Sequence, residues 1–140
     1  MSHDPALVAE TGAWLRKAAS DIRAASVDLA TTPPLTEDVV FHAQQAAEKI
    51  LKGFLVWHGR TFRKTHSLEE IGEQCLDIDP SLRLLVDRAV PLTEYAWKFR
   101  YPGDLEEPER TEAEEALAVA REIFEGVLER LPAETWPPRG

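Results

Sequence analysis

The sequence predicts an all-α protein, an up-and-down antiparallel bundle of four to five helices. Only 7 of its 140 residues are glycine, and alanine, leucine, glutamate, lysine and arginine fill most of the chain, which favours helix over strand. Apolar residues also recur at alternating steps of three and four, the spacing of one helix face. With 44% hydrophobic residues, a chain of this length is expected to form one domain around one core.

The first helix is expected to begin at Asp4-Pro5, because an N-cap residue followed by proline is typical of a helix start. Its apolar stripe needs a helical partner and consists of Leu15, Ala18, Ile22, Ala25 and Leu29. Two prolines within residues 31–34 are expected to end this helix, since a residue before proline is driven away from helical angles.

The second helix is predicted for about residues 36–58, with Gly59 at the position of a C-terminal cap. Its core positions are Val40, Ala43, Ala47, Ile50 and Phe54, followed by Leu55 or His58. On its other face, Glu48 and Lys52 have the spacing of a solvated ion pair. Ser67 and Glu70 then form the pattern of a capping box, which opens a short third helix to about residue 75.

A fourth helix is expected to begin at Asp79-Pro80, and Pro91 is expected to kink or split it before residues 92–97. Thr111 and Glu114 have the spacing of a second capping box, which opens the last helix. The stripe of that helix is Leu117, Ala120, Phe124, Val127 and Leu131. We expect one domain over residues 1–131, followed by a flexible proline-rich tail over residues 132–140.

Charge and cysteine usage limit the classes of function. The formal net charge of −9 argues against general DNA binding, because phosphates repel an acidic surface. Cys75 is the one cysteine, which excludes an internal disulfide and a multi-cysteine zinc site, and we expect it to be a small buried residue. No apolar run approaches the roughly 20 residues that span a bilayer. We therefore expect a soluble cytoplasmic protein with no membrane contact, metal or cofactor.

Positive charge is nevertheless concentrated in one segment. Residues 49–66 contain five basic residues and no acid: Lys49, Lys52, Arg60, Arg63 and Lys64, with His66 at the end. Such a segment can bind a phosphate-bearing ligand, or it can do no more than favour the C-terminal end of a helix dipole and keep that end soluble.

Four motifs in order closely resemble the HEPN domain family. They are WLRKAASDI at 14–22, FHAQQAAEKILK at 41–52, KTHSL at 64–68 and RYP at 100–102. The resemblance covers roughly residues 10–130. It implies a small helical bundle, often dimeric, which occurs in prokaryotes alone or beside a minimal nucleotidyltransferase in toxin–antitoxin-like pairs. Many members of the family are metal-independent RNases.

The RNase branch of that family uses an arginine and, four to six residues later, a histidine. The resemblance places Arg100 in the arginine position, but positions 105–107 hold a leucine and two glutamates, so no catalytic residue is assigned there. A literal match occurs at Arg60 and His66, outside the family's usual place. In that alternative, His66 would act as general acid or base and Arg60 would stabilise charge on the phosphate.

Two functional hypotheses follow. The favoured one is a nucleotide- or RNA-associated binding module, the partner of a minimal nucleotidyltransferase. Its expected ligand-binding residues are Lys49, Lys52, Lys64, His66, Arg100 and Tyr101. The other hypothesis is a metal-independent endoribonuclease toxin with a displaced or degenerate Arg/His site. A homodimer is expected in either case, because a bundle of this size often leaves one apolar seam uncovered.

Overall fold

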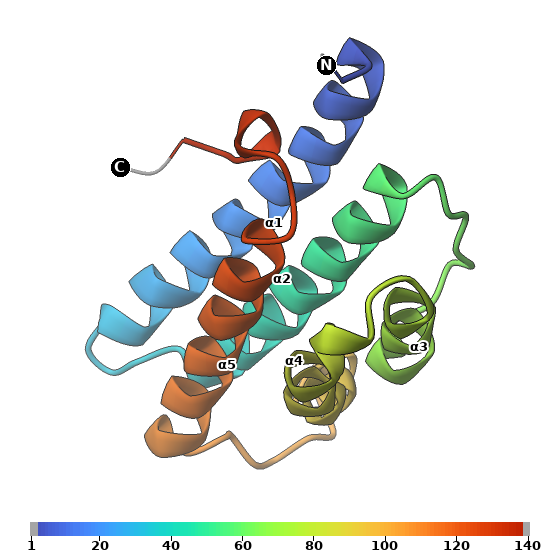
Figure 1. Cartoon of the computed structure of the whole chain (residues 1–140). Coiled ribbons are helices and arrows are strands. Elements are labelled where there is room, and N and C mark those ends of the chain that lie inside the picture. Colours follow the sequence, from blue (N-terminus) through green and yellow to red (C-terminus); the bar gives the residue numbers. More distant parts are fainter. Residues whose placement is uncertain (1–2, 139–140) are drawn as a thin grey trace.

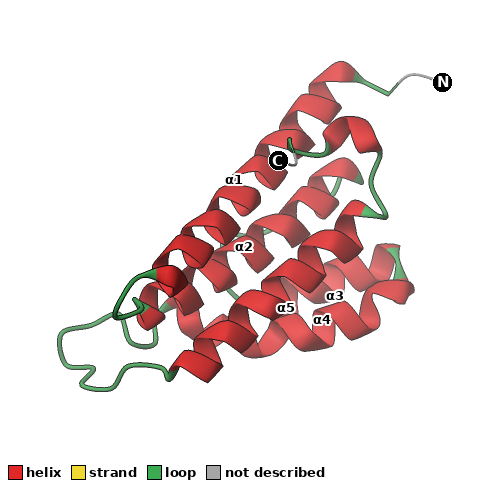
Figure 2. Cartoon of the chain, turned by 90° about the vertical axis from the view of Figure 1, so that its left-hand side faces the viewer, coloured by secondary structure: helices red, strands yellow, loops and turns green. Residues whose placement is uncertain are grey.

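The computed structural model describes residues 3–138, and the regular secondary structure of this part is entirely helical (Figure 2). Its α-helices are Pro5–Ala30 (α1), Thr36–Trp57 (α2), Leu68–Ile78 (α3), Arg83–Ala89 (α4) and Arg110–Leu128 (α5). Short 3₁₀ helices occupy Pro80–Leu82 (η1), Val90–Ala96 (η2) and Ala133–Thr135 (η3). The predicted all-α bundle of four to five helices is confirmed.

Helix α2 lies in the middle of the bundle. It runs antiparallel to α1, while α5, α3 and η2 also contact it (Figure 1). This position buries 14 of its 22 residues. Gln44, Glu48 and Lys52 are among those buried residues, and buried polar groups need partners inside the protein. The fold therefore forces polar interactions along α2.

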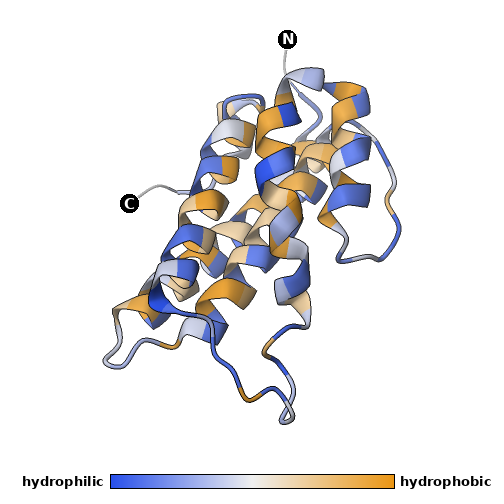
Figure 3. Ribbon diagram, turned by 90° about the horizontal axis from the view of Figure 1, so that it is seen from below, coloured by the Kyte–Doolittle hydropathy of each residue, from blue (hydrophilic) through white to orange (hydrophobic). Residues whose placement is uncertain are grey.

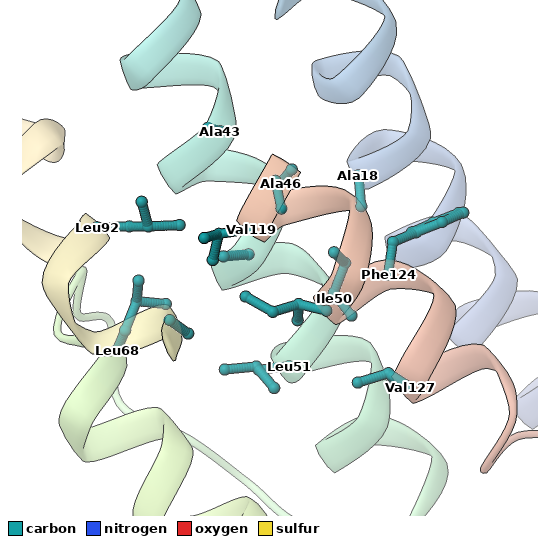
Figure 4. Close-up of a cluster of buried hydrophobic side chains, with 14 of the residues drawn as sticks. Ala18, Ala43, Ala46, Ile50, Leu51, Leu68, Leu92, Val119, Phe124 and Val127 are labelled. Atoms are coloured by element: carbon teal, nitrogen blue, oxygen red, sulfur yellow. The ribbon is translucent and has the colours of Figure 1, made fainter. Parts of the chain in front are cut away.

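The hydrophobic core extends from α2 to every other α-helix, and Figure 4 shows its central part. Ile50 of α2 and Val127 of α5 are fully buried there, as is Leu68 at the start of α3. Ala18 of α1 is also fully buried, and its small side chain lets α1 approach α2 closely. Hydrophobic residues turn inward and the connecting loops are largely hydrophilic (Figure 3). Burial of apolar surface thus follows the predicted helical stripes.

Local capping signals act at several helix ends, among them the starts of α1 and α3 and the end of α2. Asp4 Oδ1 accepts a hydrogen bond of 2.9 Å from the Ala6 amide, and Ser67 Oγ accepts one of 3.2 Å from the Glu70 amide. Gly59 has φ +69°, the left-handed conformation that a C-terminal cap requires. The capping box predicted at Thr111 is wrong, because α5 begins at Arg110 and its N-cap makes no side-chain hydrogen bond.

Pro91 divides the fourth helical segment, as predicted. Helix α4 ends at Ala89, and the chain continues as the 3₁₀ helix η2. Proline lacks the amide that an α-helix needs, and its ring clashes with the preceding turn. This change of helix type leads into the loop of residues 97–109, which contains Arg100 and Tyr101.

The described part of the C-terminal tail packs against the bundle, which differs from the flexible tail that we expected. Thr135 is 1% exposed, and η3 contacts α1. Trp136 Nε1 donates to the backbone oxygens of Leu128 and Leu131, at 3.0 and 3.1 Å. Leu128 is the last residue of α5 and Leu131 lies three residues beyond it, so neither carbonyl has the amide donor that a continuing α-helix would supply. The last two residues of the expected tail, 139–140, lie outside the described part of the chain.

Candidate functional site

Glu48 lies at the centre of the candidate site, on the middle turns of α2. His66 Nδ1 lies 2.7 Å from Glu48 Oε1, and Lys52 Nζ lies 3.4 Å from Glu48 Oε2. Gln44 Nε2 donates to Glu48 Oε1 at 3.3 Å and to the backbone oxygen of His66 at 3.4 Å. We call these four residues the Glu48 cluster. They join α2 to the connector of residues 58–67 that follows it.

The ion pair inside this cluster is buried. Lys52 and Glu48 have side chains that are 10% and 7% exposed, so the prediction of a solvated pair is wrong. Lys52 Nζ also donates to the backbone oxygen of Thr65 at 3.3 Å and lies 5.4 Å from the ring centre of Phe62. A second ring, that of Trp14, lies 5.9 Å from the same ammonium. Lys52 therefore holds the connector against α2 and presents little charge to solvent.

His66 has a different exposure from its partner. Its side chain is 63% exposed, whereas the carboxylate that binds it is buried. An ionised Glu48 can only accept, so His66 donates from Nδ1, and Nε2 has no partner within the described residues. A histidine held in this way can form a hydrogen bond to a ligand through Nε2. It can also exchange a proton with the ligand at that atom.

Lys49 and His42 meet a second carboxylate, that of Asp21 on α1. Lys49 Nζ lies 2.6 Å from Asp21 Oδ2, and His42 Nδ1 lies 2.9 Å from Asp21 Oδ1. The Asp21 side chain is 12% exposed. This arrangement bridges α1 and α2 and balances the charge of Lys49, which makes Lys49 a weaker anion ligand than its position in the sequence indicates.

Arg100 reaches the same helix from the loop of residues 97–109. Its guanidinium carbon lies 3.8 Å from the ring centre of Phe41, and Nη1 lies 3.8 Å from Asp38 Oδ1. The residue before it, Phe99, has φ +68°, an unfavourable conformation for a residue with a side chain. The next residue, Tyr101, is 64% exposed. The strained turn thus directs Arg100 onto α2 and leaves Tyr101 in solvent.

Arg100 and His66 approach neighbouring parts of α2. They contact Phe41 and Glu48, which are seven residues apart and therefore share one face of the helix, separated by about 10 Å along its axis. Lys64 is exposed, has no ion pair within the described residues and precedes His66 by two residues in the connector. We call Arg100, Tyr101, Lys64 and His66 the outer residues of the site.

Arg60 does not join this group. It is exposed, and its side chain makes no hydrogen bond or ion pair within the part of the chain that the structure describes. Its amide binds the backbone oxygen of Leu55 at 2.9 Å, where α2 ends. Arg60 and His66 make no direct contact within the described residues, and the Arg60–His66 pair of the RNase alternative stays a prediction. Arg100 is an arginine that contacts the same face of α2 as His66.

Sequence reasoning did not identify Asp21, Gln44 or Glu48 as parts of the site. A usable signal existed for Asp21, because His42 and Lys49 are seven residues apart and so share a helix face that needs a carboxylate opposite. Glu48 was found as a pair with Lys52, but its bond to His66 depends on how the connector folds.

The comparisons with known proteins agree with this architecture. The HEPN domain family matches residues 11–131, so the chain belongs to that family. No curated protein matches the chain, and no solved structure matches it either. Within residues 3–138, no cluster of histidine, cysteine or acidic side chains is arranged to hold a metal ion. None of the helices described is both long and apolar enough to cross a membrane.

Proposed function

We propose that this HEPN domain binds a phosphate-bearing ligand, a nucleotide or a short RNA, along the face of α2 between Arg100 and Lys64. The observation that carries the proposal is that Arg100 and His66 come from two separate loops to one face of one helix. Arginine binds phosphate through its planar fork, and lysine adds a second positive charge. Tyr101 is exposed beside Arg100, where it can stack on a base.

In this proposal the six expected binding residues have two roles. The outer residues contact the ligand. Lys49 and Lys52 are already bonded to carboxylates, so they position the two helices and the connector. The domain would act beside a minimal nucleotidyltransferase, as the family resemblance implies. A gene for such an enzyme next to the gene for this chain would support that part of the proposal, and its absence would count against it.

Titration calorimetry with ATP, NAD and a short single-stranded RNA tests the proposal. Arg100→Ala should make the free energy of binding less favourable by about 1–3 kcal/mol for the ligand that the wild type binds, because a charge-assisted hydrogen bond is lost. Arg83→Ala is a matched control, since Arg83 Nη1 lies 3.8 Å from Asp87 Oδ1, the same separation as in the Arg100–Asp38 pair. Equal affinity of both variants, or no binding by the wild type, would contradict the proposal.

One observation favours a second candidate function, that of a metal-independent endoribonuclease. Glu48 holds His66 through Nδ1 and leaves Nε2 exposed, an arrangement that also orients a general acid or base. Positions 105–107 lack the family histidine, so we expect the purified protein to cleave RNA poorly. Incubation of RNA with the protein and a chelator distinguishes the two. Efficient cleavage that His66→Ala abolishes would establish the RNase and exclude a purely binding role.

A further inference from the structure

Unpaired positive charge gathers on a groove between α1 and α5, away from the face of α2 discussed above. Of the described lysines and arginines, six form no ion pair with a carboxylate. Three of the six line this groove: Arg16, Arg23 and Arg121. In a chain of net charge −9, three arginines without a carboxylate partner along one groove favour the binding of an anionic partner.

The groove consists of two adjoining hollows of about 400 and 700 Å³, which share Ala19, Pro137 and Pro138. The smaller hollow has an apolar floor that includes Ile22 and Phe124. The larger one lies beside Arg16, Ser20 and Arg23. Figure 1 shows the tail beyond the end of α5, with η3 beside α1. The groove can therefore take a ligand that combines an apolar group with negative charges.

Two further details define its charge. Arg121 Nη2 donates to Ser26 Oγ at 2.5 Å, a contact that fixes the guanidinium between α5 and α1. Glu125 is the one carboxylate in the described lining of either hollow. Positive charge thus exceeds negative charge in the groove. An arginine fork pairs readily with a carboxylate in two parallel hydrogen bonds.

The same chain carries a segment with the complementary chemistry, residues 104–109. Leu105 is 93% exposed, the most exposed large apolar side chain described. Glu106, Glu107 and Glu109 are exposed and have no ion pair within residues 3–138. The segment leads into the first turn of α5, whereas Arg121 lies eleven residues further along, a rise of about 16 Å. Its position at the opposite end of α5 makes a contact with its own groove unfavourable.

We propose that residues 104–109 of a second copy of this chain dock in the α1–α5 groove. Leu105 packs on the apolar floor, and the glutamates pair with Arg16 and Arg23. Two-fold symmetry repeats the contact, so that each copy supplies one segment and one groove. Because the segment begins three residues after Tyr101 in the same loop, docking also fixes the loop that carries Arg100 and Tyr101. The inference does not depend on which ligand, if any, binds along α2.

A charge-reversal experiment tests this contact. Arg16→Glu/Arg23→Glu reverses the groove, and Glu106→Lys/Glu107→Lys reverses the segment. Each variant alone mismatches both contacts of its homodimer, and we expect at least a tenfold rise in the dimer dissociation constant, measured by analytical ultracentrifugation. In an equal mixture the two variants can form a heterodimer. There the glutamates of the reversed groove face the lysines of the reversed segment, and the native groove of one variant faces the native segment of the other. The mixture should therefore regain dimers that neither variant forms alone, and added salt should weaken them.

Controls separate this outcome from misfolding and from unspecific charge effects. Far-UV circular dichroism should show unchanged helicity in both variants, since all four positions are exposed. Arg60→Glu/Lys64→Glu changes the charge equally in the connector and should leave dimerisation unaltered. A monomeric wild type across the micromolar range would overturn the proposal. Dimers that persist in the separate variants, or a mixture that stays monomeric, would overturn it equally.

Discussion

Glu48 carries a carboxylate inside the bundle and binds two basic side chains that approach from different segments. Glu48→Gln keeps the shape of the side chain but leaves the buried ammonium of Lys52 without a counter-charge. We expect a loss of about 3 kcal/mol in the free energy of unfolding, measured by urea denaturation. The loss should exceed that of Lys52→Met, because Glu48 would still be bonded to His66 in that variant.

A double variant checks the physical reason. Glu48→Gln/Lys52→Met removes both charges and should be more stable than Glu48→Gln alone, since no unpaired ion stays buried. Equal stability of the single and double variants would show that the ammonium escapes to solvent. In that case Lys52 would be available as a ligand, as the sequence first indicated.

Cys75 allows a second test at the scale of one residue. Its side chain is fully buried, and burial raises the pKa of the thiol from 9.0 to about 12. The thiolate is the reactive form, so alkylation of the folded protein at pH 8 should proceed only through opening of the structure. We expect the labelling rate to rise by orders of magnitude in denaturant. Fast labelling without denaturant would mean that α3 is loosely packed.

The same shift gives a pH dependence of known sign. A raised pKa means that the thiol stays protonated when folded but loses its proton in the unfolded chain above about pH 9. The contribution of the buried, protonated Cys75 thiol to the free energy of unfolding is complete below that pH and is lost as the pH rises toward 12. In thermal melts, the decline of the wild type above pH 9 should therefore be steeper than that of Cys75→Ala.

At the scale of the helix, local signals predicted structure well. The caps at Asp4 and Ser67 act within three residues, and the effect of Pro91 acts within one helical turn, so a single sequence contains the information. The tail could not be predicted in this way. Its order depends on Trp136 reaching carbonyls at the end of α5, a contact that composition does not reveal.

Close approach between helices provides the next prediction. A Cβ atom on Gly72 of α3 would lie 2.5 Å from Cγ1 of Val86 in α4, so alanine forces the two helices apart. We expect Gly72→Ala to lower the free energy of unfolding by about 1–3 kcal/mol, despite the better helix propensity of alanine. Gly103→Ala is the control, because nothing lies within 4 Å of that position. A neutral Gly72→Ala would show that α4 shifts freely.

On the scale of the whole molecule, the sequence named all four outer residues of the candidate site but not their common location. Arg100 and His66 are both candidates from the sequence, yet the family pattern places the histidine four to six residues after the arginine in the chain. The structure instead brings His66 to the same helix from a loop more than thirty residues earlier. Spatial proximity of this kind arises from the packing of the bundle, which residue spacing alone does not determine.

The distribution of charge over the molecule yields the last prediction. Most cations near the α2 face are bonded to carboxylates, so a bound RNA would meet about two or three effective positive charges. The logarithm of the RNA affinity should then fall with the logarithm of salt concentration with a slope of about −1 to −2. Duplex DNA should not bind at about 0.15 M salt, because the remaining acidic surface repels it. Fluorescence anisotropy over a salt series measures both quantities. A slope of about −5 or steeper would mean that a broader basic surface, including the arginines of the α1–α5 groove, contacts the nucleic acid. That result would count against the groove as a docking site for a second copy.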